Sequence, residues 1–330
     1  MSAWVFGTLL LAGWVAGPGH AGDPSVSRPV HTYSIVAFDP ETGHMGVAVQ
    51  SHWFSVGSIV TWAEAGVGAV ATQSLVDPSY GPLALEMLRA GRSPDDALRG
   101  LLEADTASDI RQVAIVDAAG RVAAHTGDRC IPEAGHIVGD GFSVQANLME
   151  RNTVWDAMAR EYESAEGDLA ERLLVALEAA QREKGDIRGQ QSAAILIVSG
   201  KNTGRPWVDR VMDLRVEDHP DPLGELRRLV QLHRAYAHMN AGDAAMEHND
   251  TEAAEREYGA AERLNPGNLE MVYWHAVALA NAGKIEASLP LFAKVFAGDP
   301  NWRVLTPRLV PPGFLSVSPE DLERILNAAP

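Results

Sequence analysis

The hydrophobic pattern of the chain changes once, about two thirds of the way along. From residue 32 to about residue 222, short apolar runs alternate with turn residues and amphipathic segments. The last third instead repeats itself with a 34-residue period. A strand shows period two, whereas a stacked helix pair repeats over tens of residues. The 330 residues are enough for two cores, so we expect an α+β part over 32–222 and an all-α part over 223–330.

Strands and helices are grouped rather than alternating in the first part. A period-two pattern at 33–38 and 44–50, around a turn at 39–43, predicts a β-hairpin. Further strands are expected at 58–62, 66–72, 112–117, 121–126, 141–146 and 192–198. Helices are expected at 83–88, 97–102, 153–163 and 168–184. This order predicts an α+β sandwich in which helical layers cover antiparallel sheets.

Two Pro-containing turns mark the repeat of the last third, Asn265-Pro266 and Asp299-Pro300, 34 residues apart. The same offset relates three further pairs: Ala254 and Ser288, Tyr258 and Phe292, Ala261 and Val295. The pattern resembles the tetratricopeptide repeat over 235–302, and this resemblance implies helix pairs that bind a protein or peptide partner. Stacked arrays need polar outer faces, so the amphipathic segments 223–236 and 319–326 are expected to cap the ends.

The N-terminus carries an apolar run at residues 3–17, followed by Gly19-His20-Ala21. This length and these small residues predict a signal peptide at 1–21 and an exported protein, periplasmic or extracellular. Residues 22–31 would then form a linker or propeptide. The segment before the run has no Lys or Arg, so an uncleaved apolar anchor is the alternative interpretation.

Charge and motif content exclude several classes of protein. The formal net charge is −17, and neither half has the basic surface that a nucleic-acid partner requires. A lone cysteine, Cys130, forms no intrachain disulfide and is expected to be a packed thiol. There is no His-Glu-x-x-His, no P-loop and no Gly-x-Ser-x-Gly, and the 11 His residues do not cluster. We therefore expect no metal and no cofactor.

A family resemblance begins at Thr32. The motifs that carry it are Thr32-Tyr33-Ser34-Ile35-Val36-Ala37, Gly46-Val47-Ala48-Val49-Gln50-Ser51, Gly66-Val67-Gly68-Ala69-Val70-Ala71-Thr72-Gln73, Tyr80-Gly81-Pro82, Thr126-Gly127-Asp128-Arg129-Cys130 and Asp186-Ile187-Arg188-Gly189-Gln190-Gln191-Ser192. They resemble the bacterial domain-of-unknown-function family numbered 1028, over about residues 32–222. The resemblance implies a four-layer αββα sandwich of the N-terminal-nucleophile hydrolase type. It implies no substrate.

In that fold class, a Thr, Ser or Cys made N-terminal by cleavage attacks an amide carbonyl, and its own α-amine takes the proton. An α-amine has a reference pKa of about 7.7 to 8.0, which suits a general base. Thr32 stands at the head of the first predicted strand and is the candidate nucleophile, with Ser34 as the second choice. For both, an ordinary strand hydroxyl is the alternative. The chemistry requires a cut between His31 and Thr32.

Three further side chains are candidate site residues. Asn147 follows a predicted strand and is suited either to stabilising an oxyanion or to forming a turn before a helix. Gln73 ends an apolar strand, where its amide could orient a substrate or bond neighbouring backbone. Asp186 lies beside Arg188 in a turn, and the two could fix the terminal amine or form a structural ion pair.

No Lys or Arg occurs between Arg28 and Arg89. The site therefore lacks the lysine that proteasome-like members of the class place beside their nucleophile. Either the amine works with neutral partners such as Gln50, Ser51 and Gln73, or the site has lost its chemistry.

The sequence thus predicts an exported amidohydrolase that acts on a small amide or peptide-like substrate, with a helical repeat for a protein or peptide partner. The alternative is a noncatalytic αββα scaffold that recruits a partner through the repeat. We expect no nucleic-acid partner and no membrane span once the signal is removed. Assembly into a homo-oligomer through the outer helices is also compatible with the class.

Overall fold

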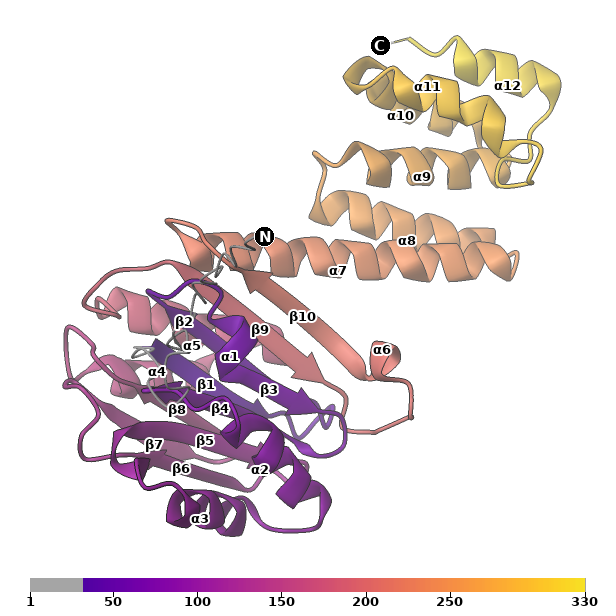
Figure 1. Cartoon of the computed structure of the whole chain (residues 1–330). Helices are drawn as coiled ribbons and strands as arrows, with labels where there is room; N and C mark the ends of the chain where they lie inside the picture. The colour runs from indigo at the N-terminus through magenta and orange to yellow at the C-terminus, as the bar shows by residue number, and fades with distance from the viewer. Residues whose placement is uncertain (1–31, 330) are drawn as a thin grey trace, which may run out of the picture.

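The computed structural model describes residues 32–329. Within them lie two antiparallel β-sheets and a C-terminal helical region (Figure 1). The predicted α+β class is therefore confirmed, and so is a helical last third. The predicted signal peptide, 1–21, and the linker, 22–31, lie outside the described residues.

The larger sheet has six strands in the order β10-β9-β2-β1-β8-β7. Their bounds are β1 Thr32–Phe38, β2 Met45–Ser51, β7 Gly135–Gly139, β8 Phe142–Ala146, β9 Ser192–Val198 and β10 Arg210–Val216. The predicted hairpin forms β1 and β2, whose register places Thr32 opposite Ser51 and Phe38 opposite Met45. The opposite edge of β1 pairs with β8, so β1 is a central strand.

The smaller sheet has four strands in the order β3-β4-β5-β6. Their bounds are β3 Thr61–Glu64, β4 Gly68–Ser74, β5 Arg111–Asp117 and β6 Val122–Thr126. Small residues in β4 permit close packing, because a Cβ at Gly68 would lie 2.5 Å from the carbonyl oxygen of Val116. The two sheets face each other across an apolar layer that includes Val36, Val47 and Ala71.

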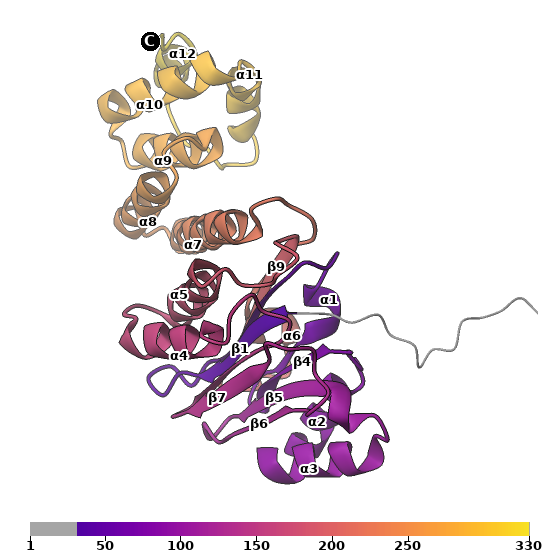
Figure 2. The same ribbon diagram turned by 90° about the vertical axis from the view of Figure 1, so that its left-hand side faces the viewer.

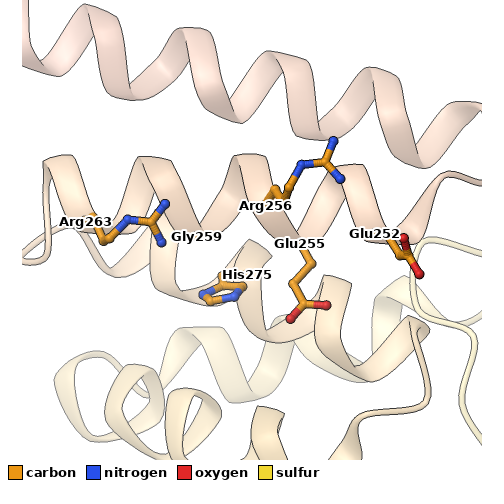
Figure 3. A pocket seen from close by; sticks show the side chains of 6 residues that line it. All are labelled: Glu252, Glu255, Arg256, Gly259, Arg263 and His275. Carbon is orange, nitrogen blue, oxygen red and sulfur yellow. The ribbon is translucent and has the colours of Figure 1, made fainter.

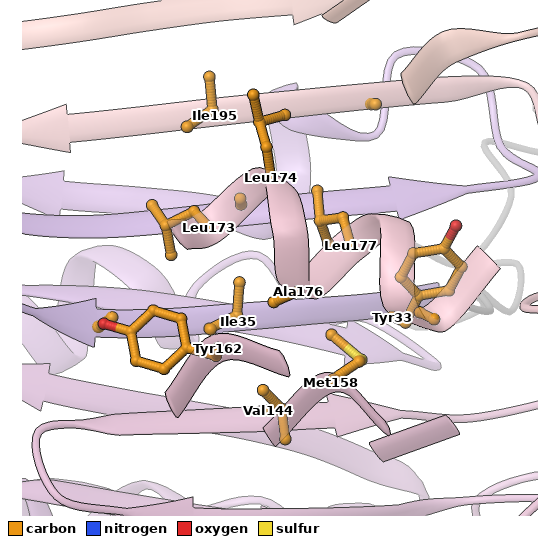
Figure 4. Close-up of a cluster of buried hydrophobic side chains, with 14 of the residues drawn as sticks. Tyr33, Ile35, Val144, Met158, Tyr162, Leu173, Leu174, Ala176, Leu177 and Ile195 are labelled. Atoms are coloured by element: carbon orange, nitrogen blue, oxygen red, sulfur yellow. The ribbon is translucent and has the colours of Figure 1, made fainter. Parts of the chain in front are cut away.

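Helices cover the outer face of each sheet (Figure 2). The helices α4, Val154–Ser164, and α5, Leu169–Arg182, pack on the six-stranded sheet through a core that includes Leu173, Ile35 and Met158 (Figure 4). The helices α2, Tyr80–Arg89, and α3, Pro94–Ala104, pack on the four-stranded sheet. This part of the molecule therefore has four layers in space, in the order helices, sheet, sheet and helices.

Helix α7, Pro222–Glu247, belongs to both parts of the chain. Its first half buries Leu223, Leu226 and Val230 in the core beneath the six-stranded sheet. Its second half buries Ala235 and Met239 against the next helix. The boundary that the sequence predicts between 222 and 223 thus falls in the first turn of a shared helix.

The C-terminal region continues with antiparallel helices (Figure 1). They are α8 Thr251–Leu264, α9 Leu269–Asn281, α10 Ile285–Gly298, α11 Asn301–Leu305 and α12 Pro319–Leu326. Residues related by the 34-residue offset are buried alike, since Tyr258 and Phe292 are both at most 3% exposed. The two aromatic side chains thus occupy buried positions in α8 and α10.

Some local expectations were wrong. Residues 58–62, predicted as a strand, begin as the short helix α1, Gly57–Val60, and only Thr61 and Trp62 enter β3. Gly57 lies so close to β9 that a Cβ there would be 2.5 Å from the Cβ of Ala194. The strands β7 and β10 were not predicted. No helix among residues 32–329 is long and apolar enough to span a membrane.

Candidate functional site at the head of strand β1

The space between the two sheets is apolar over part of its area and polar at the end where β1 begins. Side chains alternate along each strand, so Thr32 and Ser34 share the inward face of β1 with the apolar Val36. The same alternation brings amides from other strands to this end. We call the buried residues Ser34, Gln73, Gln112, Gln145 and Asn147 the amide cluster. All five are 0% exposed.

Thr32 is the first residue of β1 and is also fully buried. Its hydroxyl donates to the hydroxyl of Ser51 on the paired strand, with 3.2 Å between the oxygens. Its carbonyl oxygen accepts from the backbone N–H of Asn147 at 3.1 Å and from Nε2 of Gln73 at 3.2 Å. The position of Thr32 is therefore fixed from β2, from β4 and from the residue after β8.

Gln112 is the centre of the amide cluster. Its Oε1 accepts from Nε2 of Gln73 at 2.7 Å and from Nδ2 of Asn147 at 2.9 Å. Its own Nε2 donates to the carbonyl of Ala146 at 2.9 Å. Gln112 thus links both sheets, because Gln73 belongs to the four-stranded sheet and Ala146 to the six-stranded one. Buried amides of this kind stabilise a fold only when their polar atoms are bonded.

Ser34 closes the other side of the cluster. Its hydroxyl donates to Oε1 of Gln73 at 2.7 Å and accepts from Nε2 of Gln145 at 2.6 Å. Oε1 of Gln145 in turn accepts from the hydroxyl of Ser143 at 3.0 Å. Ser34 is therefore engaged as a link between amides, deeper along β1 than Thr32.

The cluster continues to a histidine. Nε2 of Gln112 also donates to the hydroxyl of Thr126 at 2.9 Å, and that hydroxyl lies 2.8 Å from Nδ1 of His136. Burial lowers the pKa of His136 from its ordinary value, and the nearby His125 lowers it further. Protonation of His136 is therefore less favourable than protonation of an exposed histidine.

Asp186 and Arg188 lie beside the turn that follows β2. The Arg188 guanidinium donates to Oδ2 of Asp186 at 2.7 Å, and Oδ2 also accepts from the backbone N–H of His52 at 3.2 Å. His52 follows Ser51, the residue that bonds Thr32. Burial, together with the Asp186 charge, raises the pKa of the Tyr33 phenol. The ion pair foreseen from the sequence is present, close to the head of β1 but not hydrogen-bonded to the amide cluster.

Gln50 lies on the other face of its strand. Ser51 points toward the space between the sheets, so the alternation turns Gln50 toward the helices, with Ala48. It is 0% exposed, and neither of its side-chain polar atoms has a hydrogen-bond partner within residues 32–329. As a neutral partner for an amine at Thr32, Gln50 is therefore wrongly placed, whereas Ser51 and Gln73 contact Thr32 directly.

Gln112 and Gln145 were missed by the sequence analysis. A usable signal existed, because amides interrupt otherwise apolar strands at Gln73, Gln112 and Gln145. Asn147 and Gln73, which were predicted, use their amide nitrogens to hold Gln112 and Thr32. Cys130 is buried, and its thiol donates to the carbonyl of Arg111 at 3.4 Å. Burial raises the pKa of that thiol, as expected for a packed cysteine.

Metal ligation finds no support among residues 32–329, where no group of three His, Cys, Asp or Glu side chains could hold an ion. A separate feature of the helical region is a groove of about 650 Å³. Its apolar walls include Met246, Trp274, Leu309 and Phe314, and Glu247 lies at its edge. Phe314 is 62% exposed, so the groove presents an aromatic ring to solvent.

Two facing antiparallel sheets, with a buried amide cluster at one end and a helical extension, define an α+β protein whose polar interior is unusually dense in amides. The family of unknown function DUF1028 matches residues 32–226. This match spans more than half of the chain, and the chain belongs to the DUF1028 family.

A solved structure supports this assignment. The crystal structure of protein SPO2555 from Silicibacter pomeroyi, also described as DUF1028, is 31% identical to this chain, with a TM-score of 0.54. The similarity covers 61% of this chain and 88% of that one. A search of the curated proteins finds no match.

Proposed function

We propose that the chain is an exported amidohydrolase of the N-terminal-nucleophile type, which cleaves a small amide or peptide-like substrate. The observation that carries the proposal is the placement of Thr32. It is the first residue of a central strand, its hydroxyl is bonded to Ser51, and its carbonyl is held by Gln73 and Asn147. A nucleophile must be held without reorganisation during attack, and these three contacts provide that rigidity.

Cleavage before Thr32 would supply the base. The freed α-amine would take the proton of the Thr32 hydroxyl as that oxygen attacks the substrate carbonyl, and would return it to the leaving amine. Water, losing a proton to the same α-amine, would then attack the ester formed on Thr32, and the proton would return to the Thr32 oxygen as the acid is released. Ser51 is placed to relay or orient the hydroxyl proton. The Nδ2 of Asn147 donates to Gln112 and Thr32 in the uncleaved chain, so its proposed role at the oxyanion requires a shift after cleavage. The pair of Asp186 with Arg188, which bonds the backbone of His52 beside Ser51, would fix the N-terminal amine.

The test is the mass of the mature protein. Intact-mass measurement on protein purified from the exported fraction is expected to show a start at Thr32, whereas removal of the signal alone leaves Gly22 first. Thr32→Ala is expected to abolish both this cut and turnover. Thr61→Ala is the matched control, since it removes another buried threonine hydroxyl, which donates to the carbonyl of Gly57 outside the amide cluster. A folded protein that starts at Gly22 and hydrolyses nothing contradicts the proposal.

The substrate class can be tested on the same material. We expect hydrolysis within a panel of acyl-amides, cyclic amides and muropeptide fragments, measured by release of the free amine. Activity on any of these should be absent in Thr32→Ala. Equal turnover by Thr32→Ala and the wild type would assign the chemistry to another residue.

A second candidate function is a noncatalytic scaffold with a partner-binding helical repeat of the tetratricopeptide type. The groove lined by Trp274, Leu309 and Phe314 favours it, because exposed apolar walls beside a carboxylate suit an apolar peptide with a basic residue. Under this proposal Phe314→Ala weakens capture of such a peptide while the start of the mature chain is unchanged. Peptide binding that is unaffected by Phe314→Ala contradicts it.

A further inference from the structure

A second, polar groove lies along helix α8, in a part of the molecule that neither proposed function uses. Six residues line it: Glu252, Glu255, Arg256, Gly259, Arg263 and His275 (Figure 3). The first five belong to α8 and the last to α9. We call this feature, with a volume of about 560 Å³, the α8 groove.

The floor of the α8 groove is a glycine in the interior of a helix. Gly at such a position costs about 1 kcal/mol relative to Ala, so its presence needs a local reason. A Cβ at Gly259 would lie 3.3 Å from Nη1 of Arg263 and 3.7 Å from Nε2 of His275. A methyl group at this position would thus crowd the guanidinium, whereas the imidazole lies at ordinary van der Waals distance from it.

The three arginines of α7 and Arg324 of α12 are paired with carboxylates. Arg227 and Arg234 on α7 pair with glutamate or aspartate of α5 or its N-cap, and Arg324 on α12 pairs with Glu286. Within residues 32–329, neither Arg256 nor Arg263 has such a partner. In a chain with 44 acidic residues, two unneutralised guanidinium groups in one groove are notable.

Most carboxylates near the groove are already paired with basic side chains. Glu255 pairs with Lys284, and Glu262 lies 2.7 Å from Nδ1 of His275, so its charge faces the far side of that ring. Glu252 lies at the opposite end of the groove from Arg263 (Figure 3). The end built from Gly259, Arg263 and His275 is therefore the cationic end.

We propose that the cationic end of the α8 groove binds the carboxylate or phosphate group of an anionic ligand. The Arg263 guanidinium, lying over Gly259, provides the planar pair of donors that such groups accept. His275 flanks the anion. Arg256 stands seven residues before Arg263, about 10 Å along the helix axis, and contributes attraction at longer range. The groove is open, so the affinity is expected in the millimolar range. This inference does not rest on hydrolysis at Thr32.

The test is calorimetric titration of the full chain with three probes, namely inorganic phosphate, succinate and an acetylated triglutamate peptide. Phosphate and succinate represent free anions, and the peptide represents an acidic segment of a partner. Arg263→Ala is expected to weaken binding of the best probe at least about tenfold, because hydrogen bonds to charged groups contribute that much. Gly259→Ala is expected to weaken it too, since the new methyl group displaces the guanidinium.

Arg308→Ala is the matched control, because Arg308 is an exposed arginine of the same helical region outside the groove. It should bind like the wild type. Loss of binding in Arg263→Ala and Gly259→Ala, with both variants folded by circular dichroism, supports the site. No binding of any probe overturns it, and so does binding that persists in Arg263→Ala.

Discussion

Thr32 and Asn147 are joined twice. The backbone N–H of Asn147 donates to the carbonyl oxygen of Thr32 at 3.1 Å, and the side-chain Nδ2 of Asn147 approaches the same oxygen at 3.5 Å. One of these contacts extends the sheet ladder between β1 and β8, and the other begins the amide cluster. The first residue of β1 is therefore held by the sheet and by the polar interior at once.

The amide cluster should be a major contributor to stability. Gln112→Leu removes an acceptor from Gln73 and Asn147 and a donor from the carbonyl of Ala146, all of them buried. Unsatisfied buried groups cost about 1–3 kcal/mol each, so we expect the free energy of unfolding to fall by about 3 kcal/mol. Urea denaturation measures this. Gln191→Leu, which alters an exposed hydrogen bond to Asp218, should change it by less than about 0.5 kcal/mol. Similar losses of unfolding free energy in the two variants would show that the buried amide cluster contributes no more to stability than an exposed hydrogen bond.

The ion pair beside the head of β1 gives a second prediction. Asp186 has a fully buried side chain, while that of Arg188 is 29% exposed. Asp186→Asn leaves the guanidinium without its carboxylate, and we expect a loss of about 2 kcal/mol, below the value for a pair buried on both sides. Asp213→Asn affects the more exposed pairs with Arg210 and Arg215 and should cost less than about 1 kcal/mol. Thermal or urea unfolding compares them, and equal effects would argue against a buried contribution from Asp186.

His136 should make stability depend on pH. Its pKa is lowered in the folded state by burial and by His125, whereas the unfolded chain has a histidine pKa of about 6.5. As pH falls through that value, the unfolded chain takes up a proton that the folded chain does not, so stability is lost until the folded pKa is reached. We expect wild type to lose more stability than His136→Gln between about pH 7.5 and pH 5.5.

Urea denaturation at both pH values measures the difference, because ionisable groups remote from His136 contribute equally to both proteins. His44→Gln, in the turn before β2, is the control for replacing a histidine. A His136→Gln profile that runs parallel to the wild-type profile would contradict the prediction.

Helix α7 should determine where the chain can be truncated without loss of a stable fold. A fragment of residues 32–222 lacks Leu223, Leu226 and Val230, which are at most 4% exposed in the intact core. Each such side chain contributes about 1.5–3 kcal/mol on burial, so this fragment should be unstable or aggregate. A fragment of residues 32–248 keeps all of α7 and should unfold cooperatively. Circular dichroism with size-exclusion chromatography separates the outcomes, and equal behaviour of the two fragments would refute a structural role for α7.

Much of the fold follows from local pattern, and the exceptions have physical causes. The hairpin of β1 and β2 was predictable because apolar residues recur on both sides of one turn. By contrast β10 has Arg210, Asp213 and Arg215 within seven residues and a register shift after Arg210, so its pattern is that of an exposed edge. The strand β7 has five residues and glycine at both ends, which conceals its pairing.

The candidate site was predictable in part for a different reason. Thr32 and Asn147 could be singled out from their positions at strand ends. Gln112 could not, because its importance depends on two distant residues. Gln73, 39 residues away, is its partner on the neighbouring strand, and Ala146, 34 residues away, is brought to it by the stacking of the two sheets. The alternation of apolar and polar residues along a strand indicates on which face of the sheet a side chain lies. It does not indicate which strand of another sheet will lie against that face.

The sharing of α7 has a mechanical consequence. At about 1.5 Å per residue, its 26 residues form a rod of about 39 Å that starts in the sheet core and ends among the C-terminal helices. The helical region is thus carried on a stiff arm rather than on a tether. A molecule bound to α8 or α9 would therefore be held in one direction and at one distance from the sheets. The rigid geometry of α7, rather than the conformational entropy of a flexible linker, would determine how often that molecule contacts the sheets.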